Sequence, residues 1–173
     1  TANSTGQAPA AGSAYWEMTN SSTAQIPKGG AILNGTSQYY SHVDNDNLDF
    51  GTGDFSIEWY GSLADYSSGF TQRIIGKYQD LDNRYQLSFA TTGIINLFVK
   101  KATAVIIEAN TTGIPFATEN EVGYLTVVVT RETSTTDGSM KVFKNGAFFE
   151  TVVIPSAVTV DISNTGLFEL YHN

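Results

Sequence analysis

The chain of 173 residues contains no cysteine, which excludes a disulfide framework and any metal site built on thiolates. Charged residues make up only 15% of it, and the net charge is −8. A nucleic-acid partner needs a cluster of Lys and Arg, and an anionic membrane surface attracts basic segments, so neither partner is expected. No apolar run approaches the roughly 20 residues of a membrane-spanning helix, which predicts no membrane insertion.

The sequence also lacks helical periodicity and a recognisable leader. Its periodic segments are poor in Ala, Leu, Glu and Lys and rich in Thr, Asn, Ser and aromatic residues, a composition that favours strands and turns over helices. The N-terminus shows no basic segment followed by an apolar one, so we expect no signal peptide within this sequence.

Short runs of alternating apolar and polar residues, separated by turn-forming residues, predict an all-β fold of many strands. We expect strands over residues 31–33, 38–43, 55–63, 73–78, 84–90, 94–101, 105–109, 124–131, 140–144, 147–153, 158–162 and 167–171. The most apolar of these, 124–131, is a candidate for the interior of a sheet. Asn145-Gly146 between two strands is typical of a two-residue hairpin turn with positive φ at both positions.

The stretch from residue 34 to residue 59 organises the rest. Residues 34–40 are Asn-Gly-Thr-Ser-Gln-Tyr-Tyr, and residues 48–58 are Leu-Asp-Phe-Gly-Thr-Gly-Asp-Phe-Ser-Ile-Glu. These segments, together with the later hairpin around Asn145-Gly146, resemble the concanavalin A-like lectin/laminin G-like superfamily from about residue 32 to residue 170. The resemblance departs at Gln38, where the family usually has Asp, and at Trp59, which follows Ile-Glu directly.

The resemblance implies a two-sheet antiparallel β-sandwich of the concanavalin A-like jelly-roll type over residues 31–173. Residues 1–30 are then a linker or the remnant of a preceding small module. About twenty N-terminal residues, which include Tyr15 and Trp16, resemble the end of the chitin-binding-like modules of bacteriophage tail fibres. The family usually adds one more strand after the part matched here. That strand is absent, supplied by the N-terminal segment, or lost by truncation.

Asp44 and Asp46, with Asn45, Asn47 and Asp49, form the densest acidic cluster. Calcium prefers several oxygen ligands, and many laminin G-like domains bind it at a loop edge, so Asp44 and Asp46 are candidate calcium ligands. Asx turns explain the same residues without an ion, because short Asx side chains bond to their own backbone. Both interpretations remain open, and no other cofactor is expected.

Catalytic chemistry is not evident. Glycosidases share the resembled fold and need two carboxyl groups on either side of one sugar bond, but no E-x-D-x-x-E string occurs. Glu58 is the only acid within its strand, and we expect it to be a structural or surface residue. His42 and His172 are the only histidines, and the chain has no Cys nucleophile. The sequence therefore predicts a domain that is not an enzyme.

Tyr66 and Phe70 flank the polar loop Ser67-Ser68-Gly69. An exposed ring there could stack on a sugar, because the apolar face of the ring matches the CH face of a pyranose. The alternative is that both rings fold back onto the sheet.

These observations predict a virion-associated structural or adhesion module that packs against other virion subunits or binds a host-surface glycan. A secreted, extracellular carbohydrate-binding or adhesion domain of bacterial origin is the alternative, and a glycoside hydrolase of the same fold is the third possibility.

Overall fold

The computed structural model describes residues 19–20, 39–66, 69–155 and 159–171, and their regular structure is almost entirely β-strand. The strands are β1 (Thr19–Asn20), β2 (Tyr39–His42), β3 (Phe55–Gly61), β4 (Gln72–Asp80), β5 (Asn83–Phe89), β6 (Ile95–Lys101), β7 (Ala104–Asn110), β8 (Gly123–Thr130), β9 (Gly138–Lys144), β10 (Ala147–Ile154) and β11 (Leu167–Tyr171). One short 3-10 helix, η1 (Asp46–Leu48), lies between β2 and β3. Within these ranges no helix has the length and hydropathy needed to cross a membrane.

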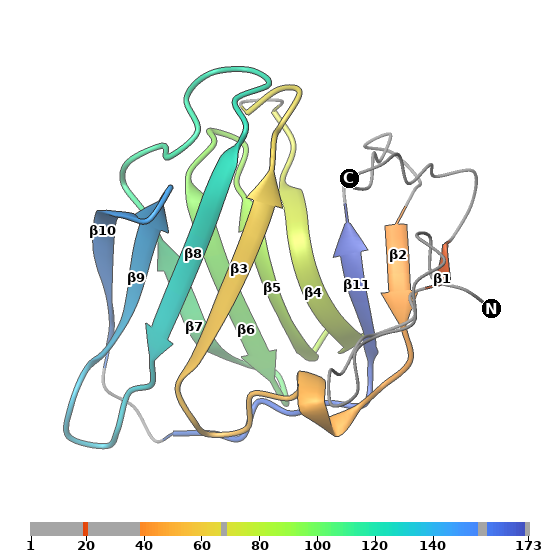
Figure 1. Cartoon of the computed structure of the whole chain (residues 1–173). Helices are drawn as coiled ribbons and strands as arrows, with labels where there is room; N and C mark the ends of the chain where they lie inside the picture. Colours follow the sequence, from red (N-terminus) through yellow and green to blue (C-terminus); the bar gives the residue numbers. More distant parts are fainter. Residues whose placement is uncertain (1–18, 21–38, 67–68, 156–158, 172–173) are drawn as a thin grey trace, which may run out of the picture.

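The strands form two antiparallel sheets that pack face to face (Figure 1). One sheet has seven strands in the order β1-β2-β11-β4-β5-β6-β7, and the other has four in the order β10-β9-β8-β3. Neighbouring strands are antiparallel throughout. This confirms the predicted fold class, an all-β sandwich of two antiparallel sheets.

The core lies between the sheets and follows the period-2 alternation of the strands. In β8, Leu125, Val127 and Val129 are fully buried, while the residues between them face outward. Leu87 in β5 and Leu97 in β6 face them from the seven-stranded sheet and are equally buried. Because a one-residue slip would turn all of these side chains to solvent, the burial pattern specifies the register of both sheets.

The Glu150 side chain, next to a bulge in β10, joins the two sheets on one side. The register shifts between Phe148 and Glu150, and the Glu150 carboxylate accepts hydrogen bonds from the backbone N–H groups of Thr112 at 2.9 Å and Gly113 at 3.0 Å, just after β7. Partial burial acts to raise the pKa of Glu150, but these bonds and that of the Thr112 hydroxyl outweigh it and hold the pKa below its usual value.

Two local predictions are confirmed. β8 lies between β9 and β3, so the most apolar strand is an interior one. Asn145 and Gly146 form the two-residue connection between β9 and β10, with φ of 52° and 78°. The side chain of Asn145 also accepts a hydrogen bond from the backbone N–H of Tyr124 at 2.8 Å, which ties the hairpin tip to β8.

One predicted strand is wrong in its described part, because residues 159–162 belong to no strand. Their backbone groups pair with loops instead: Ile162 N–H donates to Gly51 O at 3.0 Å, and Val160 O accepts from Arg131 Nη2 at 3.1 Å. The strand expected over 31–33 and the resemblance around Trp16 lie outside the described residues. Two residues of the predicted linker, Thr19 and Asn20, pair with β2 at the edge of the seven-stranded sheet.

Replacing Gly146 with Val should lower the free energy of unfolding by more than about 1 kcal/mol, because a β-branched residue resists positive φ. No atom lies within 4 Å of the position a Cβ would take, so the loss would be conformational rather than steric. Gly146→Asn is the matched control and should cost less, since Asn tolerates the left-handed region. Chemical denaturation measures both, and equal stability of the Val variant and the wild type would contradict the turn assignment.

Candidate functional site

The loop between β2 and β3 holds the candidate calcium ligands, and bonds within the loop shape it. Asn45 caps η1, because its Oδ1 accepts a hydrogen bond from the N–H of Asn47 at 2.9 Å. The N–H of Leu48 donates to Asn45 O at 2.9 Å, and the N–H of Asp49 donates to Asp46 O at 3.1 Å. Asx-type local bonding therefore accounts for the conformation of this part of the cluster.

Lys77 in β4 places a buried positive charge between two carboxylates of this loop. Its Nζ lies 2.6 Å from Asp49 Oδ1 and 2.7 Å from Asp44 Oδ1. The Lys77 side chain is fully buried, whereas Asp49 and Asp44 retain 15% and 34% of their exposure. An ammonium leaves water at tolerable cost only where opposite charges replace its hydration, so these three residues act as one electrostatic unit that attaches the loop to β4.

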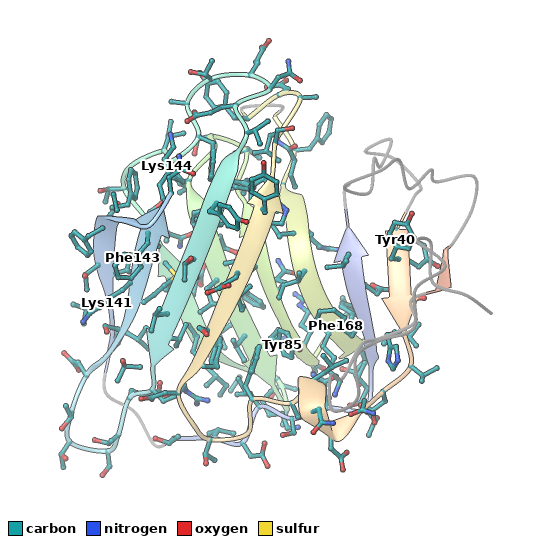
Figure 2. All side chains as sticks on the ribbon, viewed as in Figure 1. Tyr40, Tyr85, Lys141, Phe143, Lys144 and Phe168 are labelled. Atoms are coloured by element: carbon teal, nitrogen blue, oxygen red, sulfur yellow. The ribbon has the colours of Figure 1, made fainter. Side chains whose placement is uncertain are left out.

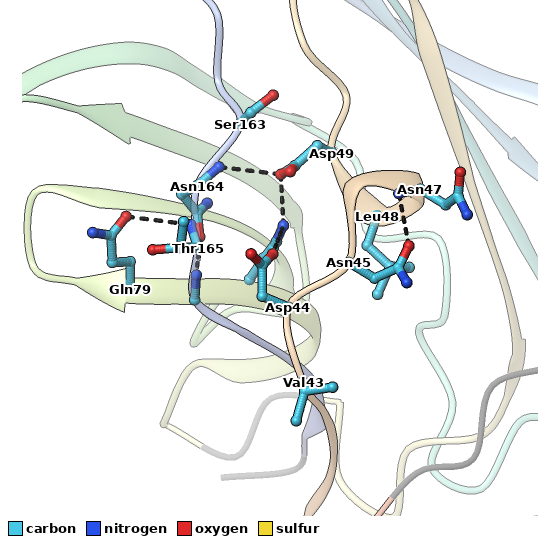
Figure 3. A network of polar contacts seen from close by, with 12 residues as sticks. Val43, Asp44, Asn45, Asn47, Leu48, Asp49, Gln79, Ser163, Asn164 and Thr165 are labelled. Atoms are coloured by element: carbon cyan, nitrogen blue, oxygen red, sulfur yellow. Dashed lines mark hydrogen bonds and ion pairs between the residues drawn. The ribbon is translucent and has the colours of Figure 1, made fainter.

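The same unit reaches the segment that leads into β11. Asp49 Oδ1 also accepts a hydrogen bond from the backbone N–H of Asn164 at 3.1 Å (Figure 3). The Asn164 side chain in turn accepts from the N–H of Gly166 at 3.0 Å. A Cβ on Gly166 would lie 2.2 Å from the backbone carbon of Tyr78, so only glycine allows this segment to approach β4 so closely.

Tyr85 in β5 completes the environment of the loop from inside the sandwich (Figure 2). Its hydroxyl donates a hydrogen bond to Leu48 O at 2.7 Å. Burial, and secondly the negative charge of Asp49, raises the pKa of Tyr85 far above its usual value. The hydroxyl is thus held protonated as a donor, which fits a structural role for this side chain.

The structure brings the candidate ligand Asp44 to Lys77, while Asp46 lies exposed in the first turn of η1. In the described ranges no group of three or more His, Cys, Asp or Glu side chains is placed to hold a metal ion. Calcium binding through Asp44 and Asp46 stays a prediction, and the ion would have to compete with Lys77 for the Asp44 carboxylate.

The two candidate sugar-stacking rings lie in different environments. Tyr66 is half-buried and packs against the core cluster, and a Cβ on Gly93 would lie 3.0 Å from Tyr66 Cδ2. Phe70 is 73% exposed. Sugar binding at Tyr66 and Phe70 also stays a prediction, and of the two only Phe70 presents most of its ring to solvent.

A larger group of aromatic side chains covers the outer face of the four-stranded sheet; we call it the aromatic platform, and it comprises Tyr60, Tyr124, Phe143 and Phe148. Tyr60 and Tyr124 face each other across β3 and β8, with ring centroids 4.5 Å apart. Phe143 and Phe148 pair across β9 and β10 at 5.9 Å, and Figure 2 shows Phe143 on this sheet. Tyr60, Tyr124 and Phe148 are 58%, 55% and 61% exposed.

Hydrogen-bonding side chains lie beside these rings on the same face. Glu58 lies opposite Thr126, which lies opposite Phe143, so that an acid, a hydroxyl and a ring share one row across the sheet. The adjacent row contains Lys141 opposite Thr151. Directly opposite side chains on a sheet are about 5 Å apart, so one ligand can contact a ring and a polar group at the same time.

The aromatic platform was not among the sites predicted from the sequence, although the sequence contains a signal for it. Trp59-Tyr60 and Phe148-Phe149 are consecutive aromatic pairs in strands. Because successive side chains in a strand point to opposite faces, one ring of such a pair turns away from the core unless a bulge intervenes. Here Trp59 and Phe149 pack against the core, and Tyr60 and Phe148 face solvent.

No protein-family model and no curated protein matches this chain. Solved structures share its fold: the binding domain of botulinum neurotoxin DC in complex with rat synaptotagmin II has a TM-score of 0.62 at 14% identity, over 91% of this chain and 39% of that one. The botulinum neurotoxin serotype C1 binding domain gives 0.62 at 14%, over 90% and 38%. The chain thus spans about two fifths of these neighbours. At such identity they show a shared β-sandwich, and any ligand has to be argued from this chain's own residues.

Replacing Lys77 with Met should lower the free energy of unfolding by about 1–3 kcal/mol, because the Asp49 and Asp44 carboxylates lose their partner but remain 15% and 34% exposed, so that water screens part of the uncompensated charge. Adding Asp49→Asn to that variant should recover part of the loss, since the more buried carboxylate then carries no charge. A double-mutant cycle by urea denaturation measures the coupling, and additive effects of the two substitutions would show that the charges act independently.

If calcium binds this loop, it binds the native fold only and stabilises it by mass action. Adding calcium after chelation should then raise the melting temperature, and Asp46→Asn should reduce the rise by removing one carboxylate. Magnesium is the matched control, because it demands a tighter octahedral site. A melting temperature that calcium and chelator leave unchanged would make the cluster a plain Asx turn.

Proposed function

We propose that this domain is a non-enzymatic adhesion module that binds a host-surface glycan on the aromatic platform. We further propose that it belongs to a virion, as part of a bacteriophage tail fibre or another virion protein. The observation that carries the glycan proposal is the platform itself, four aromatic side chains on one sheet face with three of them more than half exposed.

The chemistry of the platform suits a sugar. An aromatic ring packs well against the CH face of a pyranose, and sugar hydroxyls need donors and acceptors beside that ring. Thr126 and Glu58 supply such groups in the row of Phe143, and Lys141 and Thr151 supply them in the next row. An aliphatic partner surface would leave these polar groups unpaired, which favours a glycan over an apolar protein patch.

A binding role is favoured over hydrolysis by the distribution of acids. Hydrolysis of a glycosidic bond requires two carboxyl groups on either side of it. Glu58 is the only acidic strand residue on the outer face of the four-stranded sheet. Glu150, the other acid in these strands, bonds to the loop after β7. The core cluster fills the space between β5, β6 and the four-stranded sheet.

The virion assignment rests on resemblance. Residues 32–170 resemble concanavalin A-like and laminin G-like domains, and the first twenty residues resemble tail-fibre modules. Neurotoxin binding domains of the same fold, one of them in complex with rat synaptotagmin II, support the use of this sandwich for recognition of a host surface. Other virion subunits are then the expected structural partners.

Glycan-array screening of the full chain should detect binding to at least one host-surface polysaccharide. Tyr60→Ala and Tyr124→Ala should each weaken that binding about two- to tenfold, the equivalent of about 0.5–1.5 kcal/mol for one aromatic contact. Leu81→Ala is the matched control, because Leu81 is similarly exposed at 67% but lies on the turn between β4 and β5.

Three outcomes would contradict the proposal. The first is that the wild type binds nothing on arrays of bacterial and eukaryotic glycans. The second is that binding survives both platform substitutions and is lost in Phe70→Ala, which would place the site on the loop. The third is that the domain releases reducing sugar from a polysaccharide and that Glu58→Gln abolishes this release, which would make the domain a hydrolase.

A further inference from the structure

The edge strands of the two sheets are not equally protected against pairing with a further strand. Proteins usually shorten, bulge or charge an edge strand, because its unpaired backbone groups attract other strands. Among the described strands, β1 has only two residues, and β7 has a register shift opposite Val99 and Lys100. β10 has a bulge between Phe148 and Glu150. Three of the four edges therefore have a device against strand addition.

β3 is the fourth edge and has almost none of these devices. It has seven residues, contains no proline or lysine, and pairs with β8 in unbroken register from Phe55↔Val129 to Gly61↔Gly123. Its single charged side chain is Glu58. Within the described part of the chain no strand pairs with its other edge, so alternate N–H and C=O groups there point away from β8.

The seven-stranded sheet continues beyond β3. Trp59 of β3 packs on Phe89 of β5, with ring centroids 5.7 Å apart, whereas β11, β2 and β1 extend past β3 (Figure 1). Coverage of the inner face is uneven there: Leu87 of β5 is 0% exposed, Ile75 of β4 is 9% exposed and Tyr40 of β2 is 4% exposed.

Two apolar side chains of β11 continue this inner face. Leu170 lies opposite Ile75, and Phe168 lies opposite Lys77, so both point to the side of the four-stranded sheet. Both are partly buried and pack against the edge of the core cluster, whereas Tyr40, opposite Leu170 in β2, is only 4% exposed. A fifth strand beside β3 would cover the part of Phe168 and Leu170 that stays exposed.

We propose that the free edge of β3 is a strand-addition site for an extended segment of a partner polypeptide. Its backbone would pair with β3, its alternate apolar side chains would face Phe168 and Leu170, and a basic side chain would lie opposite Glu58. This site uses the backbone edge of the sheet and shares only the Glu58 side chain with the proposed glycan site, whose rings lie on the outer face.

Charge decides between a foreign strand and a second copy of this chain. Each copy has a net charge of −8, so two copies repel. Antiparallel pairing of β3 with its own copy, centred on the strand, would also set Glu58 opposite Glu58, and directly opposed like charges destabilise a sheet. The edge therefore fits a partner strand that is basic where β3 is acidic.

A fusion to the full chain tests this site. A flexible Gly/Ser linker of about 20 residues spans roughly 25 Å and holds a tethered strand at about millimolar effective concentration. The tethered strand alternates Val and Thr and has Lys at its centre. Hydrogen–deuterium exchange should show rapid exchange of alternate β3 amides in the unfused chain and at least tenfold slower exchange in the fusion. The control is the same strand with proline at alternate positions, which cannot donate to a ladder and should give no protection.

Reversing the charge at position 58 tests whether the edge selects a basic partner strand. In Glu58→Lys the strand with a central Lys should protect β3 less, and a strand with a central Glu should restore the protection. Equal exchange of β3 amides in the fusion and the proline control would overturn the proposal. Protected β3 amides in the unfused chain would also overturn it, because the occupant would then be a second copy in concentration-dependent dimers, or a segment of the same chain in the monomer. Tyr60→Ala, which tests glycan binding, should leave the protection of β3 in place, so the two proposals can fail separately.

Discussion

The buried ammonium of Lys77 is the interaction on which the arrangement around β4 depends. It holds the loop between β2 and β3 through Asp44 and Asp49, and Asp49 in turn holds the backbone of Asn164 ahead of β11. β2 and β11 are neighbours in the sheet, so one charge positions the chain on both sides of that pairing. The cost of burying this charge is offset only while both carboxylates stay in place, which makes the loop a structural element rather than a free surface loop.

A second buried cation holds the other end of the same loop. The guanidinium of Arg131 is 3.2 Å from Glu132 Oε1, and it donates to Gly51 O at 3.3 Å and to Val160 O at 3.1 Å. The backbone N–H of Arg131 also donates to the Asp54 carboxylate at 2.7 Å. Residues 44–54 are thus attached to both sheets by ionic and backbone contacts. A stretch rich in Asx and Gly is therefore held in place at both of its ends.

The features that could be predicted from the sequence are those with local causes. The alternation in β8 and the positive φ demanded by Asn145-Gly146 depend on neighbouring residues, and both are confirmed. The ion-pair partner of Asp44 could not be predicted, because Asp44 lies in a loop and Lys77 in β4, and nothing in the sequence pattern links the two residues. Residues 159–162 have the β-branched composition of a strand, yet the loop carbonyl of Gly51 and the side chain of Arg131 take up their backbone groups. The aromatic platform has a local signal in Trp59-Tyr60, because alternation turns one ring of such a pair to the outer face.

One strand, β3, contributes to the core, to the outer face and to the edge of the four-stranded sheet. Ile57 and Trp59 face inward and pack in the core, while Glu58 and Tyr60 face outward, where Tyr60 is part of the aromatic platform. Its backbone pairs with β8 on one side and with no described strand on the other. Because core packing and pairing with β8 already specify its register, the outward side chains and the free edge can change without moving the strand. The inward side chains and the pairing with β8 are therefore enough to keep this strand in the sandwich, a fold that the chain shares with solved structures only 12–14% identical to it.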